Sequence, residues 1–244
     1  MAEADRLGDA ETAALLARRP VALLPLGALE SHGEHLPAGT DNILALRLAE
    51  RLEAAADDVP IWRLPLLPYG QVWSLEEAPG SVGISGETLV ALIVDIGRAV
   101  RRKGVAALAV LNAHLGNAPY IREAQRRLAA EGFAVAGFFY PGAAPHVARL
   151  RRSRPAHPAY MHACEIETSY MLHLAPEAVR MEAAQPNYPA FPEDFEVRPR
   201  RWTEFSDSPV LGDPTVACAE TGEAIIAASI ETMVAHLRAL QRAG

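Results

Sequence analysis

The sequence is poor in cysteine and has no excess of basic charge. Its 244 residues include only two cysteines, Cys164 and Cys218, so at most one disulfide can form, and a chain of this length does not need one to bury a core. Lysine and arginine number 23 against 30 aspartates and glutamates, which gives a formal net charge of −7. A polyanion gains little attraction from such a chain, and we predict no nucleic-acid partner.

Long apolar runs and nucleotide-binding loops are also missing. No stretch reaches the roughly 20 consecutive apolar residues of a membrane helix, so we predict no membrane association. Acids and arginines are mixed over residues 1–19, where a secretory signal needs a basic flank and then an unbroken apolar stretch, so we expect a cytoplasmic protein. Glycine-rich phosphate loops of the Walker or dinucleotide type are absent, which argues against nucleotide-dependent chemistry.

Apolar runs of strand length alternate along the chain with stretches of helical spacing. The predicted strands are 21–25, 61–67, 105–111 and 133–140. The predicted helices are 9–18, 42–56, 87–103, 119–131, 165–174 and 215–242, the second of them capped by Thr40 or Asp41. Such alternation implies parallel strands joined by right-handed crossovers. We therefore predict one domain over residues 1–244, with an α/β fold in which a mainly parallel central sheet forms a three-layer α/β/α sandwich.

Prolines gather in the second half of the chain, around residues 141–158 and 186–214. Proline lacks a backbone N–H and interrupts both helices and central strands. We expect long ordered loops in these two segments.

Three polar segments follow predicted strands or open a predicted helix. They cover residues 25–41, 112–117 and 162–169, and none contains lysine or arginine. In open α/β sheets, ligands bind beyond the carboxyl ends of the strands. Crowded acids without a positive side chain repel one another, and a bound cation relieves that repulsion. Mixed imidazole and carboxylate groups suit zinc, manganese, iron or cobalt, so we predict a metal site.

The order of residues in these segments resembles the creatininase family. The three signatures are Pro-Leu-Gly-x-x-Glu-x-His-Gly-x-His-Leu-Pro-x-x-Thr-Asp, Asn-x-His-x-Gly-Asn and His-Ala-x-x-x-Glu-Thr-Ser. The later Leu211-Gly-Asp-Pro-Thr215 also resembles that family, so the likeness extends from about residue 20 to the end. It implies a creatininase-like fold and a homo-oligomer, a hexamer as in relatives.

The resemblance also implies two divalent metal ions per subunit, zinc foremost with manganese or iron as alternatives. The implied ligands are Glu30, Asp41 and His114 for one ion and His32, Asp41 and Glu167 for the other. Asp41 would bridge the two ions, and a hydroxide shared between them would attack the substrate. By the same resemblance His162 would carry a proton to the leaving nitrogen.

Two asparagines flank the histidine of the second signature. Asn112 and Asn117 are expected to fix the His114 ring by hydrogen bonding, as the outer partners of metal-binding histidines usually do.

Three residues depart from the family pattern, and we expect them to contact the substrate. Leu115 stands where the family has a glycine, which would make one wall of the pocket apolar. Glu77 replaces a usual histidine and would favour a cationic or hydrogen-bond-donating substrate. Trp73 would either stack on a flat substrate or anchor its loop.

These residues together predict a metal-dependent amidohydrolase with a small-molecule substrate. The expected reaction is hydrolysis of a C–N bond in a small cyclic amide, a lactam or a formamide. Within the same family, the alternatives are a peptidase that processes a mycofactocin-type precursor peptide and a deformylase of a pyrimidine formamide. A keto-sugar ring hydrolase and a family member without catalytic activity are two further alternatives.

Overall fold

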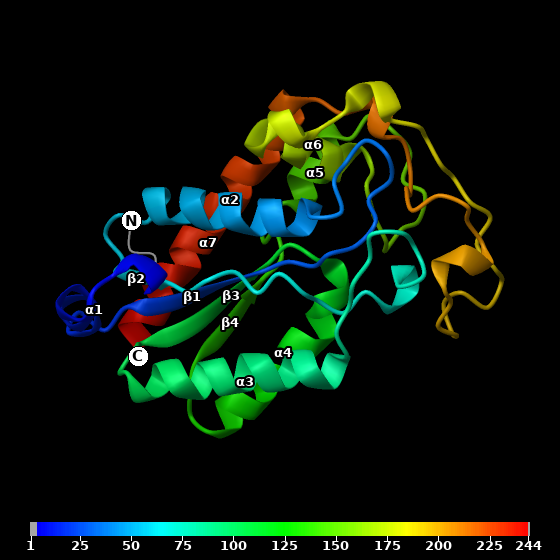
Figure 1. Ribbon diagram of the computed structural model, residues 1–244. Coiled ribbons are helices and arrows are strands. Elements are labelled where there is room, and N and C mark those ends of the chain that lie inside the picture. The colour runs from blue at the N-terminus through cyan, green and yellow to red at the C-terminus, as the bar shows by residue number, and fades with distance from the viewer. Residues whose placement is uncertain (1–3, 244) are drawn as a thin grey trace.

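The apolar runs of the sequence form one parallel sheet in the computed structural model, which describes residues 4–243 (Figure 1). The strand order is β2-β1-β3-β4, with β1 at Val21–Leu26, β2 at Ile61–Arg63, β3 at Ala107–Asn112 and β4 at Val135–Phe138. β1 and β3 are buried along their whole length, as expected for apolar strands covered on both faces. Residues 1–3 and 244, parts of the predicted domain and amino-terminal segment, lie outside the described residues.

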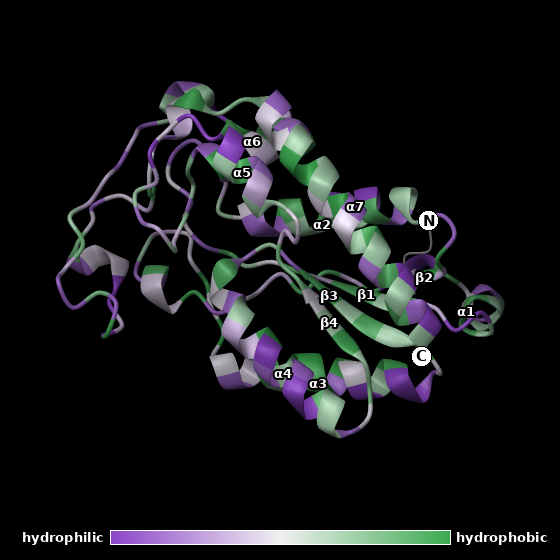
Figure 2. Ribbon diagram, turned by 180° about the vertical axis from the view of Figure 1, so that it is seen from behind, coloured by the Kyte–Doolittle hydropathy of each residue, from purple (hydrophilic) through white to green (hydrophobic). Residues whose placement is uncertain are grey.

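Helices cover both faces of the sheet (Figures 1 and 2). One layer contains α2 (Thr40–Ala55), α5 (Ala144–Leu150), α6 (Glu165–Leu174) and α7 (Ala219–Ala243). The opposite layer contains α3 (Gly86–Arg102) and α4 (Ala118–Ala130), and α1 (Asp9–Leu16) precedes the first strand. Each layer packs on the sheet through its own apolar cluster, which confirms the predicted three-layer α/β fold. No helix within residues 4–243 is long and apolar enough to cross a membrane.

The structure differs from the predicted elements at three places. β2 ends at Arg63, and only an isolated bridge from Leu26 to Leu67 continues the pairing. The proline-rich segment near residue 145 forms α5, because a proline fits the first turn of a helix, whose N–H groups have no partner there. The last helix begins at Ala219, because Asp213 caps a separate 3-10 turn before it.

Helix α2 begins two residues earlier than predicted. Thr40 and Asp41 lie inside its first turn, and Gly39 takes the capping position without a side-chain hydrogen bond. The prediction that Thr40 or Asp41 caps this helix was therefore wrong. The carboxylate of Asp41 does not bond the helix end, and it faces two histidines instead.

Candidate metal centre

The acids and histidines of the three signatures meet at the carboxyl ends of β1 and β3. Glu30 and His32 follow β1, His114 follows β3, Asp41 lies in the first turn of α2 and Glu167 in that of α6. These five residues, here called the ligand cluster, are all at most 7% exposed. Segments far apart in the sequence therefore converge on one buried point, as predicted.

Asp41 stands between two groups of potential ligand atoms. In the first group, Nδ1 of His114 lies 3.0 Å from Glu30 Oε1 and 3.2 Å from Asp41 Oδ2. In the second, Nε2 of His32 lies 3.6 Å from Asp41 Oδ1 and 3.7 Å from Glu167 Oε2. Within each group the ligand atoms lie within 4.8 Å of one another. Each oxygen of Asp41 thus faces a different group, the arrangement that a bridging carboxylate requires.

Backbone carbonyls select the ring nitrogen that each ligand histidine presents. Nδ1 of His32 contacts the carbonyl of Glu30 at 3.0 Å, and Nε2 of His114 contacts the carbonyl of Gln71 at 2.8 Å. A carbonyl oxygen only accepts, so these nitrogens carry the hydrogen and donate it. The other nitrogen of each neutral ring then has its lone pair directed at the carboxylates. This orientation is the one that metal-binding histidines usually show.

Two atoms of the cluster are buried without a hydrogen-bond partner among residues 4–243. They are Nε2 of His32 and Oδ2 of Asp41. The 3.2 Å approach of His114 to Asp41 Oδ2 lacks the alignment of a hydrogen bond. Burying an unpartnered polar atom costs about 1 to 3 kcal/mol, and a metal ion would satisfy both atoms at once. The residues present therefore fit a metal site.

The charges of the cluster favour a cation. Burial opposes protonation of His32, but Asp41 and then Glu167 outweigh it and raise the pKa of His32 to about 10. The same opposition, with Glu30 as the leading carboxylate, raises the pKa of His114 well above its ordinary value. Burial also opposes ionisation of Glu30 and Asp41, yet the two histidines hold both carboxyl pKa values below their usual range. For Glu167, desolvation dominates and raises the pKa.

The start of α6 positions Glu167. Ala163 has a left-handed backbone conformation with φ of 49°, and its N–H donates to Glu167 Oε2 at 2.5 Å. A non-glycine residue adopts this conformation only when its surroundings hold it there. The strained turn therefore aims the carboxylate toward His32.

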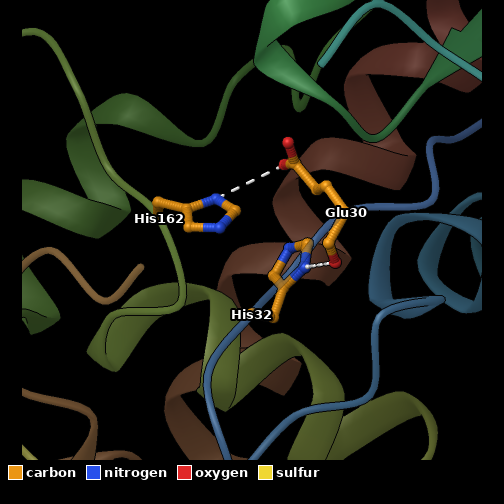
Figure 3. Close-up of side chains that lie close together, drawn as sticks. All are labelled: Glu30, His32 and His162. Atoms are coloured by element: carbon orange, nitrogen blue, oxygen red, sulfur yellow. Dashed lines mark hydrogen bonds and ion pairs between the residues drawn. The ribbon is translucent and has the colours of Figure 1, made fainter. Parts of the chain in front are cut away.

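His162 lies beside the cluster rather than within its two ligand groups. Figure 3 shows its ring next to His32, with a distance of 4.3 Å between ring centroids. Its Nε2 donates to the carbonyl of Ser31 at 2.8 Å, and its Nδ1 lies 3.5 Å from Glu30 Oε1. Together with Glu30 and His32 it forms a third group that could hold an ion.

The two predicted outer asparagines bind backbone groups and not the His114 ring. Asn112 bonds the backbone N–H and carbonyl of His114, while Oδ1 of Asn117 accepts from the N–H of Gln71 at 2.9 Å. Asn117 also donates to the carbonyl of Gly27. Because the Gln71 carbonyl holds the ring, Asn117 acts on His114 through the backbone of Gln71.

A cavity of about 390 Å³ opens onto the cluster and His162, and we call it the apolar cavity. Leu115 lines it, as expected. Trp73 does not line it and stacks under the guanidinium of Arg201 at 4.3 Å. Glu77 lines a neighbouring cavity of about 660 Å³ and accepts a hydrogen bond from Thr203 at 2.6 Å.

Sequence reasoning missed one prominent residue of this wall. Trp202 lines both cavities, and its ring lies edge-on to His162 with 5.5 Å between centroids. It belongs to the irregular proline-rich segment 186–214, where no motif marks it. Only the proximity of two strand-end loops to that segment reveals it.

The fold and the site together define a class of α/β proteins with a candidate two-metal centre at the strand ends. The chain belongs to the creatininase family, since the family model described as creatinine amidohydrolase matches residues 6–237. Members of this family are hydrolases, as the names of the relatives below state.

Named relatives point to two activities. The mycofactocin precursor peptide peptidase of Mycobacterium tuberculosis (strain CDC 1551 / Oshkosh) is 33% identical, over 93% of this chain and 88% of the relative. The creatinine amidohydrolase of Pseudomonas putida is 27% identical, over 89% and 88%. Among solved structures, "Creatininase Mn" is 25% identical with a TM-score of 0.80 and covers 97% of both chains. A mutant creatininase of the Zn-Zn type gives 25% and 0.80, over 97% of this chain and 96% of that one.

Proposed function

We propose that this protein is a two-metal hydrolase that cleaves a C–N bond. The observation that carries the proposal is the pair of carbonyl-oriented histidines, His32 and His114, on either side of the shared Asp41. Glu30, Asp41 and His114 would hold one ion, and His32, Asp41 and Glu167 the other. Zinc or manganese suits these ligands, and the creatininase structures named for those metals support both.

The chain's own residues divide the work around that centre. Two bound divalent ions supply Lewis acidity, which polarises a carbonyl and acidifies water. The carboxylates of Glu30, Asp41 and Glu167 balance the charge of the ions in a buried site. His162 is held by the Ser31 carbonyl through Nε2, so Nδ1 is the atom free to exchange a proton. That nitrogen faces the apolar cavity, where it would protonate the leaving nitrogen.

Two substrate classes remain candidates for this centre. A small cyclic amide, lactam or formamide is supported by the resemblance to creatinine amidohydrolase. Processing of a precursor peptide is supported by the higher identity to the mycobacterial peptidases, 33% over 93% of the chain. We place peptide processing first, because an apolar cavity of about 390 Å³ exceeds the needs of a single small ring.

Metal analysis combined with a substrate panel tests the proposal. Purified protein, Glu30→Gln, Asp41→Asn and the exposed control Asp58→Asn are compared for bound metal and for hydrolysis of cyclic amides, formamides and short peptides. We expect both cluster variants to lose metal and turnover, and Asp58→Asn to keep both. Turnover unaffected by the two cluster variants would remove the proposed function.

We also propose a homohexamer, by resemblance to the family. Analytical ultracentrifugation of the metal-loaded protein measures the assembly directly. A monomeric mass at micromolar concentration would remove this proposal without touching the metal centre.

A further inference from the structure

The apolar cavity contrasts with the charged cluster at its floor. Its walls away from the ligands include Leu75, Leu115, Phe139, Met161 and Trp202. Within the described part of the chain, no lysine or arginine lines it. A substrate carboxylate would find no side-chain cation here, whereas an apolar group would leave water and gain packing contacts.

The indole that closes this cavity has a fixed orientation. Nε1 of Trp202 donates to the carbonyl of Ser208 at 3.0 Å, which satisfies its only polar atom. The ring then meets the His162 ring at 61°, in an edge-on contact. An aromatic face held in this way offers a flat apolar surface beside the histidine that we place in catalysis.

The residues on either side of this indole tie its segment to the turn near residue 75. The Arg201 guanidinium covers the Trp73 ring at 4.3 Å and bonds Glu76 at 2.7 Å. On the other side, Thr203 donates to Glu77 at 2.6 Å. The wall is therefore tethered at two points, and the departures from the family pattern at Trp73 and Glu77 serve this tether.

Leu115 closes the opposite side, directly after the ligand His114. It begins the 3-10 turn Leu115–Asn117 and is partly buried. A glycine at this position would leave the wall open, because it has no side chain to contact the substrate. Leu115 and Trp202 thus both narrow the space next to the cluster with apolar atoms.

We propose that the apolar cavity is a specificity pocket for a bulky apolar or aromatic group attached to the scissile amide, with Trp202 and Leu115 as its specificity-determining residues. The inference rests on the proposed function, because the amide itself must lie at the ligand cluster. A cavity of about 390 Å³ has the volume of about a dozen liquid water molecules, enough for a phenyl or branched aliphatic group beside the amide. The substrate class is therefore an amide that carries such a group, in preference to a small polar or cationic ring.

Binding of hydroxamates to the zinc-loaded protein tests this pocket without requiring turnover. A hydroxamate chelates metal through an amide-like head group, so its side chain reports on the cavity. The probes are acetohydroxamate, 4-methylpentanohydroxamate, phenylacetohydroxamate and the cationic 4-guanidinobutanohydroxamate, each measured by calorimetry. We expect phenylacetohydroxamate to bind at least about tenfold more tightly than acetohydroxamate, from burial of the ring. The cationic probe should show no comparable gain.

Variants assign this gain to the two walls. Trp202→Ala and Leu115→Ala should each reduce the phenyl gain to less than about threefold while acetohydroxamate still binds. Trp202→Phe should restore most of it, and Val197→Ala should leave it unchanged, because Val197 belongs to the same segment but is 85% exposed. A full phenyl gain in both alanine variants would overturn the assignment.

The same probes separate failure of the pocket from failure of the metal centre. If acetohydroxamate binds but the phenyl group adds nothing, the specificity pocket is wrong and the proposed function stands. If the cationic probe binds most tightly, the pocket is likewise wrong. If zinc loads but no hydroxamate binds, the proposed function fails and the pocket fails with it.

Discussion

Zinc binding to the metal-free protein at pH 8 is expected to release about two protons per chain. In the metal-free fold, burial opposes protonation but the surrounding carboxylates raise the pKa of His32 to about 10 and that of His114 well above 6.5. Both rings therefore carry a proton at pH 8, where an ordinary histidine is neutral. A metal ion needs the lone pair of each ring, so both protons must leave.

The size of this competition follows from the pKa of His32. A rise from 6.5 to about 10 corresponds to about 5 kcal/mol of attraction between the imidazolium and its surroundings. That contribution to the stability of the metal-free fold is complete below pH 6.5 and is lost as the pH rises through about 10. Apparent zinc affinity should therefore increase by about tenfold per pH unit for each displaced proton across this window.

Calorimetry in buffers with different ionisation enthalpies counts the protons. The observed binding enthalpy plotted against buffer enthalpy has a slope equal to the number released. His35→Gln is the matched control: burial and then the nearby His32 lower the pKa of His35 to about 4, so it is neutral at pH 8 and its loss should not change the count. A slope near zero in the unmodified protein would refute the claim that the buried carboxylates keep these imidazoles charged.

Three further predictions concern single residues. His162→Gln should retain its metal and lower kcat by about 10²- to 10⁴-fold, measured by elemental analysis and steady-state kinetics, because proton transfer to the leaving nitrogen is lost. Gly222→Ala should destabilise the fold by about 2 kcal/mol and lower Tm by about 5 °C in calorimetry, because a Cβ there would overlap the Ser169 backbone oxygen where α6 and α7 pack; Gly39→Ala, with open space around it, should change Tm little. Because the folded-state pKa of His35 is depressed to about 4, its stabilising contribution is complete above pH 6.5 and declines as the pH falls toward 4; His35→Gln should flatten that decline in acid denaturation, and an unchanged slope would count against it.

The order of elements could be predicted because the core strands are almost purely apolar. The runs that became β1 and β3 have no polar residue that would direct one face to water, and both are fully buried. Boundaries were less certain. The predicted strand 61–67 shortened to three residues, because only those pair with β1 in a continuous ladder. The helix α5 went unpredicted because its seven residues are too few for a periodic pattern.

The ligand cluster could be predicted because each member belongs to a short motif at a strand end or helix start. The groups that orient it could not. Gln71 and Ser31 contribute only their backbone carbonyls, and a carbonyl is present at every residue, so no residue type marks them. Trp202 reaches the cavity from an irregular segment more than 80 residues beyond Leu115 in the sequence, and nothing in local spacing indicates that contact.

Orientation of the rings by main-chain oxygens separates two properties that are often entangled in enzymes. The ion cage depends on peptide geometry around Glu30, Ser31 and Gln71, while the fit to the substrate depends on side chains at Leu115 and Trp202. Replacing those two side chains leaves every carbonyl that aims an imidazole in place. A library restricted to these positions could therefore retune amide selectivity while the catalytic ions stay seated, which makes this scaffold a practical starting point for directed evolution.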